Sequence, residues 1–420
     1  MTRAFPAAAA ALVLLAAAVR LPGQSFRSFD EEAAAAESVR LRLGPLRLVP
    51  RFRLTEAGYD SNVYYRGEDG EAVADMTATL SPELRGFWPV GRAALLSFTE
   101  NPEYVFYGRE KGLRAFTHSF SAGLRLRLLR GLSLGGGYHA DRHVRRVMSE
   151  LDRRIRDSSA GGTAALFFET PRGTALGLTG RVDDFRYKDV ASGAPDDIYG
   201  RALDRREVSA GLEIHYRVFS ASRLFAVVEW TRYAFAHAES AWRDAEAVAV
   251  AGGLRFPLTG RARGTVRLGW KAFRPDAAGR EPFAGLVAAS EATVRLGRAA
   301  VTLGYGRDNA FSYIETAYYY IDSRARARLS LYVAPFLRLD AGVQLGAMTY
   351  PGPQTVWTGG GPVVVDRRRD DDRVFSAGPV VRLGGTAGLG LTFNVYARES
   401  NAPGFDIRRT FAGAFVTYEF

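Results

Sequence analysis

Apolar and polar residues alternate along most of this chain. From Phe120 to Leu128 every second residue is Phe, Ala or Leu, and the residues between them are Ser, Gly or Arg. The same alternation recurs around Glu213, Arg326 and Asp340. Because a strand sends successive side chains to opposite faces of its sheet, this period of two predicts strands with one apolar and one polar face. The chain is therefore expected to be all-β.

About eighteen strands can be delimited from residue 46 onward, or about sixteen if one hairpin is miscounted. Their connections are alternately tight, as at 89–91 and 130–131, and longer, as at 60–73, 190–204 and 351–371. This alternation is typical of a transmembrane antiparallel up-and-down β-barrel of the outer membrane. The expected strands are 46–59, 74–88, 92–107, 115–129, 132–149, 158–170, 173–188, 205–218, 222–238, 243–257, 262–274, 283–297, 299–309, 315–334, 336–350, 372–384, 386–401 and 406–420.

A soluble β-sandwich is the rival interpretation, since it would show the same alternation with its polar face outside. The length of the strands favours the barrel, because strands of soluble proteins usually have about five or six residues. The final ten residues, FAGAFVTYEF, also alternate and end in Phe420, as the last strand of an outer-membrane barrel usually does. We expect residues 46–420 to form one barrel whose last strand pairs with its first. In this register Phe411 and Phe415 face the interior, which indicates a partly filled lumen.

The N-terminal segment differs from the rest of the chain. A basic start at Thr2-Arg3 and an apolar run over 7–19 predict a secretory signal peptide at 1–25, with an N-terminal anchor helix as the alternative. Residues 26–45 include the helix-prone sequence DEEAAAAES and are expected to be a short periplasmic lead-in, too short for a plug domain. The chain has no cysteine, so a disulfide framework is excluded.

Positive charge is the most suggestive chemical feature of the chain. The net charge is +11, but the export signal and the strand periodicity argue against a nucleic-acid partner. Arginine forks on the wall of a water-filled lumen attract carboxylates and phosphates, which predicts a preference for anions. Alternatively, the arginines pair with acidic residues and lipopolysaccharide phosphates, or merely solvate the wall. The expected pore-lining residues are Arg47, Arg51, Arg53, Arg125, Arg127, Arg181, Arg217, Arg267, Arg324, Arg326, Arg328, Arg338, Arg382 and Arg398.

Catalytic and metal-binding patterns do not stand out. His139 and His143 share a strand face, but four residues of strand span about 13 Å, too far for two ligands of one metal. No hydrolase-type motif lies near a histidine, and the acidic loop segments lack the spacing of a calcium loop. We expect no enzymatic activity, no cofactor and no metal.

One short motif resembles a known family. The segment RLVPRFRLTEAGYDSNVYY, from Arg47 to Tyr65, resembles the opening of the putative β-barrel porin family, whose first strand ends in a YDSN-type motif. Members are Gram-negative outer-membrane proteins, and some are encoded with exopolysaccharide or capsule machinery. The resemblance implies a location in the outer membrane, contact with its lipid and lipopolysaccharide, and a connection with polysaccharide-export components. The C-terminal strand is the expected contact for the barrel-assembly machinery.

The function expected from these features is a channel or porin-like conduit for hydrophilic solutes, including anionic solutes or acidic polysaccharide. Loops 190–204 and 351–371 are expected to fold inward and narrow it. The alternative is a non-conducting structural or surface-polysaccharide assembly barrel.

Overall fold

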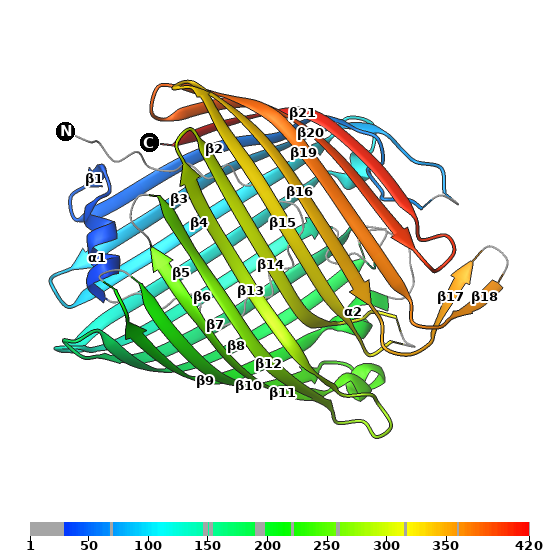
Figure 1. Ribbon diagram of the computed structural model, residues 1–420, viewed down its shortest axis with the longest axis horizontal. Helices are drawn as coiled ribbons and strands as arrows, with labels where there is room; N and C mark the ends of the chain where they lie inside the picture. The colour runs from blue at the N-terminus through cyan, green and yellow to red at the C-terminus, as the bar shows by residue number, and fades with distance from the viewer. Residues whose placement is uncertain are drawn as a thin grey trace.

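The computed structural model describes residues 29–67, 70–145, 150, 154–189, 198–219, 222–257, 261–314, 317–358 and 361–419. The expected signal peptide and Phe420 lie outside these residues. The described part of the chain is dominated by one closed antiparallel barrel of eighteen long strands, and the short strand β1 (Leu41–Leu43) pairs antiparallel with residues 46–48 of β2 (Figure 1).

The barrel strands follow one another around the wall in chain order. Their positions agree with the predicted strands to within a few residues, and the predicted count of eighteen is confirmed. The strands are β2 (Leu46–Asp60), β3 (Asp75–Val90), β4 (Ala94–Tyr107), β5 (Ala115–Leu129), β6 (Leu132–Arg145), β7 (Ile155–Glu169), β8 (Thr174–Asp189), β9 (Arg205–Arg217), β10 (Arg223–Phe235), β11 (Ala245–Pro257), β12 (Ala262–Pro275), β13 (Phe283–Leu296), β14 (Ala299–Phe311), β15 (Tyr319–Ala334), β16 (Leu337–Thr349), β19 (Arg369–Leu383), β20 (Ala387–Ser400) and β21 (Ile407–Glu419).

The barrel closes where β2 pairs with β21, as predicted. Arg51 lies opposite Glu419, and Tyr59 lies opposite Ala412. Between these positions β2 contains a bulge, in which Glu56 takes a positive φ of 52°. Such a bulge changes which residues of β2 face inward, so Arg51 on one side of it and Asp60 on the other share the inner face. Closure leaves neither strand with a free edge.

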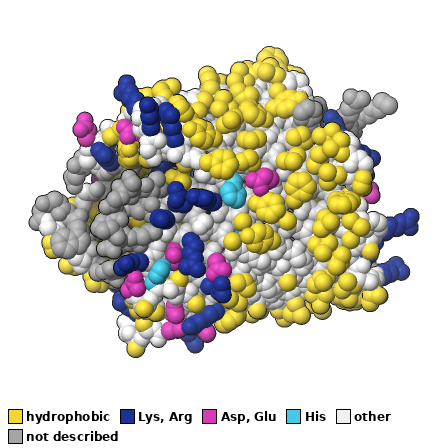
Figure 2. Space-filling view, turned by 180° about the vertical axis from the view of Figure 1, so that it is seen from behind, with side chains coloured by type: hydrophobic (Ala, Val, Ile, Leu, Met, Phe, Trp, Pro, Cys, Tyr) yellow, Lys and Arg dark blue, Asp and Glu magenta, His cyan; other side chains and the backbone are white. Residues whose placement is uncertain are grey.

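The outer face of the barrel is apolar. Large side chains at every second position remain exposed there, among them Leu178 at 58%, Leu286 at 59% and Leu391 at 57%. Figure 2 shows such side chains spread over the wall of the barrel. In a soluble β-sandwich these positions would be buried, so the pattern of exposure indicates a surface in contact with lipid.

The ladder between β3 and β4 is interrupted halfway along. The two strands pair up to Leu80 and again from Leu84, but the residues between have no ladder partners on β4. Continuing the register places Pro82 opposite Pro102. Neither proline has an N–H group to donate, which explains the gap.

The two inward-facing phenylalanines of β21 are accommodated by glycines. A Cβ atom placed on Gly390 would lie 2.3 Å from the Phe415 ring, so only glycine leaves room for that ring. The ring of Phe411 covers Gly413 in the same way. Phe411 is only 3% exposed. These rings therefore lie flat on the wall instead of filling the middle of the lumen.

Helix α1 (Phe29–Glu37) covers the helix-prone part of the lead-in. Several other small elements were not predicted: the helix α2 (Ile198–Leu203), the 3-10 turns η1 (Lys111–Leu113) and η2 (Ala238–Arg243), and a hairpin of β17 (Gln354–Thr358) and β18 (Gly361–Val365). In the described part of the chain, no helix has the length and apolar character that a membrane crossing requires.

The β17–β18 hairpin corrects one expectation. Loop 351–371 was expected to fold inward, but Val356 and Val365 pack against Ala402 and Phe405 of the β20–β21 connection. Figure 1 shows the hairpin projecting beyond the end of the barrel. Apolar contact with a neighbouring loop at the rim therefore holds it outside the lumen.

Candidate functional site: the barrel interior

The fourteen arginines predicted from the alternation lie on the face opposite the exposed apolar side chains. On β15, for example, Arg324 and Arg326 alternate with Leu329 and Leu331, which are 44% and 40% exposed on the outside. The arginines are distributed over β2 (47, 51, 53), β5 (125, 127), β8 (181), β9 (217), β12 (267), β15 (324, 326, 328), β16 (338), β19 (382) and β20 (398). The barrel thus brings them to one interior surface.

Most of these arginines have acidic partners on the same surface. At least nine form an ion pair with a described carboxylate, so much of the positive charge of the wall is balanced locally. The pairs are Arg51–Glu83, Arg53–Glu83, Arg125–Glu32, Arg127–Asp30, Arg181–Asp183, Arg217–Glu169, Arg324–Asp322, Arg326–Glu291 and Arg338–Asp340.

The other five predicted arginines differ in environment. Arg47 donates to the Gly44 carbonyl at 2.9 Å, and Arg398 donates to the Phe405 carbonyl at 2.7 Å. Arg267 is 1% exposed on β12, whereas Arg328 and Arg382 are partly exposed. Carbonyl groups and packing therefore also hold guanidinium groups in place along the wall.

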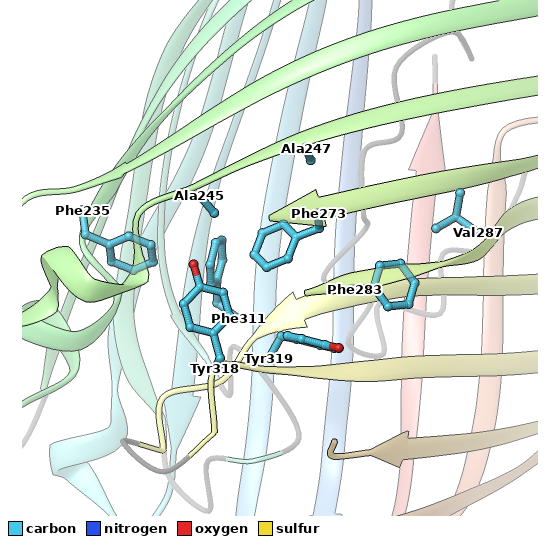
Figure 3. Packing of buried hydrophobic residues seen from close by; sticks show 9 residues of the cluster. All are labelled: Phe235, Ala245, Ala247, Phe273, Phe283, Val287, Phe311, Tyr318 and Tyr319. Carbon is cyan, nitrogen blue, oxygen red and sulfur yellow. The ribbon is translucent and has the colours of Figure 1, made fainter. Parts of the chain in front are cut away.

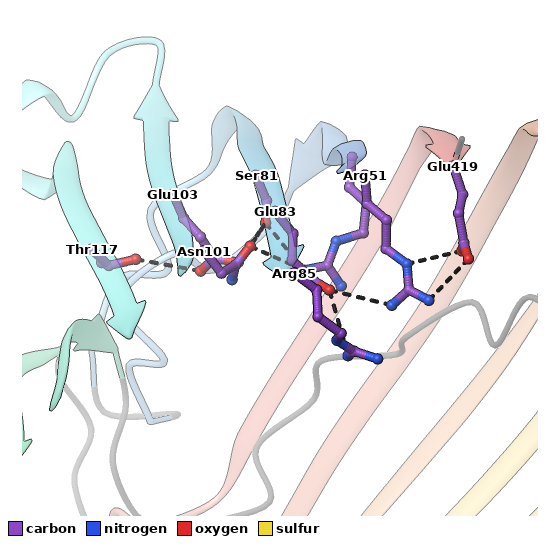
Figure 4. Close-up of polar contacts among 9 residues, drawn as sticks. Arg51, Ser81, Glu83, Arg85, Asn101, Glu103, Thr117 and Glu419 are labelled. Carbon is purple, nitrogen blue, oxygen red and sulfur yellow. Dashed lines mark hydrogen bonds and ion pairs between the residues drawn. The ribbon is translucent and has the colours of Figure 1, made fainter. Parts of the chain in front are cut away.

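A polar network crosses the closing seam of the barrel (Figure 4). Arg51 on β2 lies 2.9 Å from Glu419 on β21 and 3.3 Å from Glu83 on β3. Glu83 also receives a hydrogen bond of 3.4 Å from Arg53. The first, second and last barrel strands are thus connected by charged side chains as well as by their backbones.

The same network spans the interruption between β3 and β4. The Ser81 hydroxyl lies 2.9 Å from both the Asn101 Oδ1 and the Glu103 Oε1 atoms, and Thr117 on β5 donates to Glu103 at 3.3 Å. Side-chain hydrogen bonds on the inner face therefore replace the missing backbone pairs.

Part of the inner wall is open to water. Arg326 and Glu291 form an ion pair of 2.5 Å, although their side chains are 51% and 58% exposed. Both residues lie on the inner face, so this exposure is toward the lumen. A charged, solvated wall of this kind suits hydrophilic solutes and does not suit a core packed with side chains.

Helix α1 lies at the periplasmic mouth, the end with the tight turns (Figure 1). Its first turn carries three acidic residues. Asp30 contacts Arg127, and Glu32 contacts Arg125 at 2.8 Å, both on β5. Glu31 reaches Arg223 on β10, five strands away around the wall, at 3.3 Å.

Apolar contacts also hold α1 against the wall. Phe29 and Ala36 are buried with Leu95 on β4, and Phe87 packs against them. The Arg127 guanidinium lies 4.4 Å from the centre of the Phe29 ring. The predicted lead-in is thus a docked helix that obstructs part of the mouth.

An aromatic cluster lines the extracellular end of β10 to β15 (Figure 3). Phe235, Phe273, Phe283 and Phe311 pack there, with ring centres of Phe235 and Phe311 5.0 Å apart. Tyr318, from the connection between β14 and β15, lies over this cluster with its ring centre 5.6 Å from that of Phe273. The described residues of this connection, 312–314 and 317–318, therefore lie over the inner face of the wall.

Two other connections contact the described residues of the β14–β15 connection. Arg243 of η2 donates to the Ser312 carbonyl, and the Tyr318 hydroxyl donates to the Arg243 carbonyl at 2.6 Å. Glu150, from the β6–β7 connection, accepts hydrogen bonds from the Ser312 hydroxyl at 2.6 Å and from the Tyr313 N–H at 3.0 Å. Burial raises the pKa of the Glu150 carboxyl, although both hydrogen bonds favour its charged form.

Helix α2 also lies on the inner face at this end. Together with the described residues of the β14–β15 connection, it is referred to below as the extracellular constriction. It belongs to loop 190–204, and its Tyr199 and Leu203 are buried against Ile155 and Tyr187 on the inner face of β7 and β8. The ring centre of Tyr199 lies 5.6 Å from that of Tyr313. The described part of this loop lies inward, as the sequence predicted.

Several inner-face residues were missed from the sequence. Arg223, which binds both Glu31 and Glu169, is one of them. Its strand also carries Phe225 and Val227 on the inner face, so both faces of β10 are largely apolar. The sequence of this strand therefore does not show which of its residues face inward. Among the described residues, no group of three or more histidine or acidic side chains is arranged to hold a metal ion.

Comparisons with known proteins agree with this architecture. The family model described as "Putative beta-barrel porin 2" matches residues 35–420. The outer membrane protein OpdK from Pseudomonas aeruginosa has a similar structure over 89% of this chain and 98% of its own, with 12% sequence identity and a TM-score of 0.50. OccK9 (OpdG) from the same organism covers the same shares, with 14% identity and a TM-score of 0.49. At 12% identity the likeness to OpdK concerns the fold alone. No curated protein sequence matches the chain.

Proposed function

Because the chain belongs to the family described as putative beta-barrel porin 2, we propose that it is a constricted channel for small hydrophilic solutes with a preference for anionic ones. It is a protein of the outer membrane of a Gram-negative bacterium. The observation that supports a channel most directly is the solvated inner wall at Arg326 and Glu291.

The preference for anions is expected to be moderate. Ion pairs neutralise much of the arginine charge, and only the guanidinium groups left in excess attract a passing carboxylate or phosphate. Arg51, Arg53 and Arg85 contact the carboxylates of Glu83 and Glu419, so three guanidinium groups face two carboxylates at that point of the wall. Small anionic solutes such as acidic sugars fit this wall better than cations do.

Planar-bilayer recording in a salt gradient tests both parts of the proposal. Purified protein should give discrete conductance steps, and the reversal potential should have the sign of anion preference. Replacing Arg326→Gln should reduce that preference because it removes a solvated cation from the wall. Arg274→Gln, on the outer face of β12, is the matched control and should leave the potential unchanged. Cation preference in the unaltered protein would contradict the anionic part of the proposal.

A non-conducting assembly barrel is the second candidate, favoured by the obstructions at both ends. Removing residues 26–45 and replacing Tyr318→Ala in the same chain distinguishes the two. A channel should then conduct more strongly than the unaltered protein. Absence of conductance in both proteins, with the barrel correctly folded, would favour the structural role.

A further inference from the structure

Basic side chains gather on the outside of the barrel near the extracellular ends of β6, β7 and β8. They are Arg142, Arg156, Arg186 and Lys188. The ladders joining these strands have no register shift, so even-numbered residues keep to one face throughout. That face is the outer one, because the even-numbered Tyr138, Leu166 and Val182 are exposed on it at 51%, 38% and 42%.

The register brings these cations close together. Arg156 lies directly opposite Lys188, and Ser158 lies between Arg142 on one side and Arg186 on the other. Residues directly opposite in an antiparallel pair have Cβ atoms about 5 Å apart, and like charges at such positions destabilise the sheet. An anion bound at this place would relieve that repulsion.

The described carboxylates nearby do not supply enough negative charge. Asp184, on the same face, is engaged by Arg206 through two hydrogen bonds of 2.9 and 3.0 Å. Arg186 lies 3.5 Å from Asp204. Among the described residues, Arg142, Arg156 and Lys188 have no carboxylate within ion-pair distance.

The inner face of the same strands behaves differently. Arg145 points inward and forms two hydrogen bonds with Asp157, of 3.2 and 2.9 Å. This inward cation thus has a described carboxylate partner, unlike Arg142, Arg156 and Lys188 on the outer face.

The position of the cluster indicates what the anion is. Arg186 follows the exposed Val182 by four residues, about 13 Å along the strand. Figure 2 shows basic side chains gathered at the edge of the apolar surface. Basic groups at the extracellular edge of an apolar, lipid-facing band are expected beside the headgroups of the outer leaflet. An arginine guanidinium binds phosphate through two parallel hydrogen bonds.

We propose that Arg142, Arg156, Arg186 and Lys188 form a binding site for the phosphate groups of a phosphorylated glycolipid in the outer leaflet. The Ser158 hydroxyl, between Arg142 and Arg186, adds a hydrogen-bond donor to the site. The cluster, referred to as the β6–β8 basic site, fixes a lipid on one side of the barrel and so gives it a preferred lipid neighbour there.

Binding of purified, detergent-solubilised protein to micelles of bisphosphorylated lipid A tests this proposal. The double variant Arg156→Gln/Lys188→Gln should bind about tenfold more weakly, as expected for the loss of two charge-assisted contacts to phosphate. The matched control is Arg232→Gln/Arg274→Gln, which removes two outward cations that lie opposite Glu246. This control should bind as the unaltered protein does.

A second arm needs no variant and so does not depend on folding. Unaltered protein should bind dephosphorylated lipid A about tenfold more weakly than the bisphosphorylated form, again because charge-assisted contacts are lost. Inorganic phosphate at equal concentration should compete only weakly. Equal binding of the two lipids, equal loss in both double variants, or tight binding of inorganic phosphate without a preference for lipid would each overturn the proposal.

Discussion

Docking of α1 at the periplasmic mouth should control the fraction of time that the channel spends in its open state. The perturbation is the triple variant Asp30→Asn/Glu31→Gln/Glu32→Gln, which keeps the size of the side chains and removes the charges that contact Arg127, Arg223 and Arg125. The barrel strands are unchanged, so the variant should fold.

The exposure of the partners sets the magnitude. Asp30 is 82% exposed, so its ion pair contributes close to nothing. The Glu32–Arg125 pair, at 26% and 16% exposure, and the Glu31–Arg223 pair, at 46% and 5%, each contribute about 1 kcal/mol at most. The triple variant should therefore weaken docking by at most about 2 kcal/mol, which changes the ratio of docked to undocked helix by up to roughly thirtyfold.

The apolar contacts of Phe29 remain in this variant, so docking should weaken without being abolished. Burying a phenylalanine side chain contributes about 2 kcal/mol, which is similar to the sum of the ion pairs. Single-channel recording should show a larger fraction of time in the open state. Raising the salt concentration should open the unaltered protein further and affect the variant less, because salt screens exposed ion pairs.

Glu37→Gln is the control, since it removes a charge from the same helix at its last position, away from the acidic first turn. It should behave as the unaltered protein does. An identical open fraction and an identical salt response in the triple variant would refute the view that these ion pairs hold the helix.

Three further predictions concern the extracellular constriction and the wall. Because burial raises the pKa of Glu150, its ionised form costs stability once the pH exceeds the ordinary value of 4.5, and this cost grows until the raised pKa is reached. The contacts of Glu150 with Ser312 and Tyr313 should weaken over this range, so single-channel conductance should rise with pH above 4.5, and Glu150→Gln should flatten this pH dependence. Tyr318→Ala removes a ring that covers Phe273 and should increase single-channel conductance, whereas an unchanged step size would place the limiting constriction elsewhere. Gly390→Val should destabilise the barrel by about 1–3 kcal/mol because the new side chain would collide with the Phe415 ring. Gly306→Ala places its Cβ in open space and should leave the free energy of unfolding unchanged; urea unfolding in lipid measures both.

The wall of the barrel could be predicted from the sequence because its determinants are local. A period of two fixes which face of a strand is apolar, and short turns alternating with long loops fix the order of the strands around the barrel. The pairing of β2 with β21 follows from closure alone. Arg324 and Arg326 were placed on the inner face for these reasons.

The partners of those arginines could not be predicted in the same way. Asp372 contacts Arg324 from β19, two strands away, and such a contact depends on side-chain length and on the shift between strands. Residues 312–318 have no periodicity of their own in the sequence, and Ser312 is held by Arg243 and Glu150, which come from other loops. Arg223 was missed because Phe225 and Val227 make the inner face of its strand as apolar as the outer one.

The contacts of α1 also imply an order of events during assembly. The helix precedes the first barrel strand in the chain, yet one of its charged partners, Arg223, belongs to β10, and the others belong to β5. Its docking surface is therefore complete only when the curved wall has brought β5 and β10 to face the same mouth. A newly formed barrel passes through a stage with an unobstructed periplasmic end, and the helix reaches its place last although it is synthesised first.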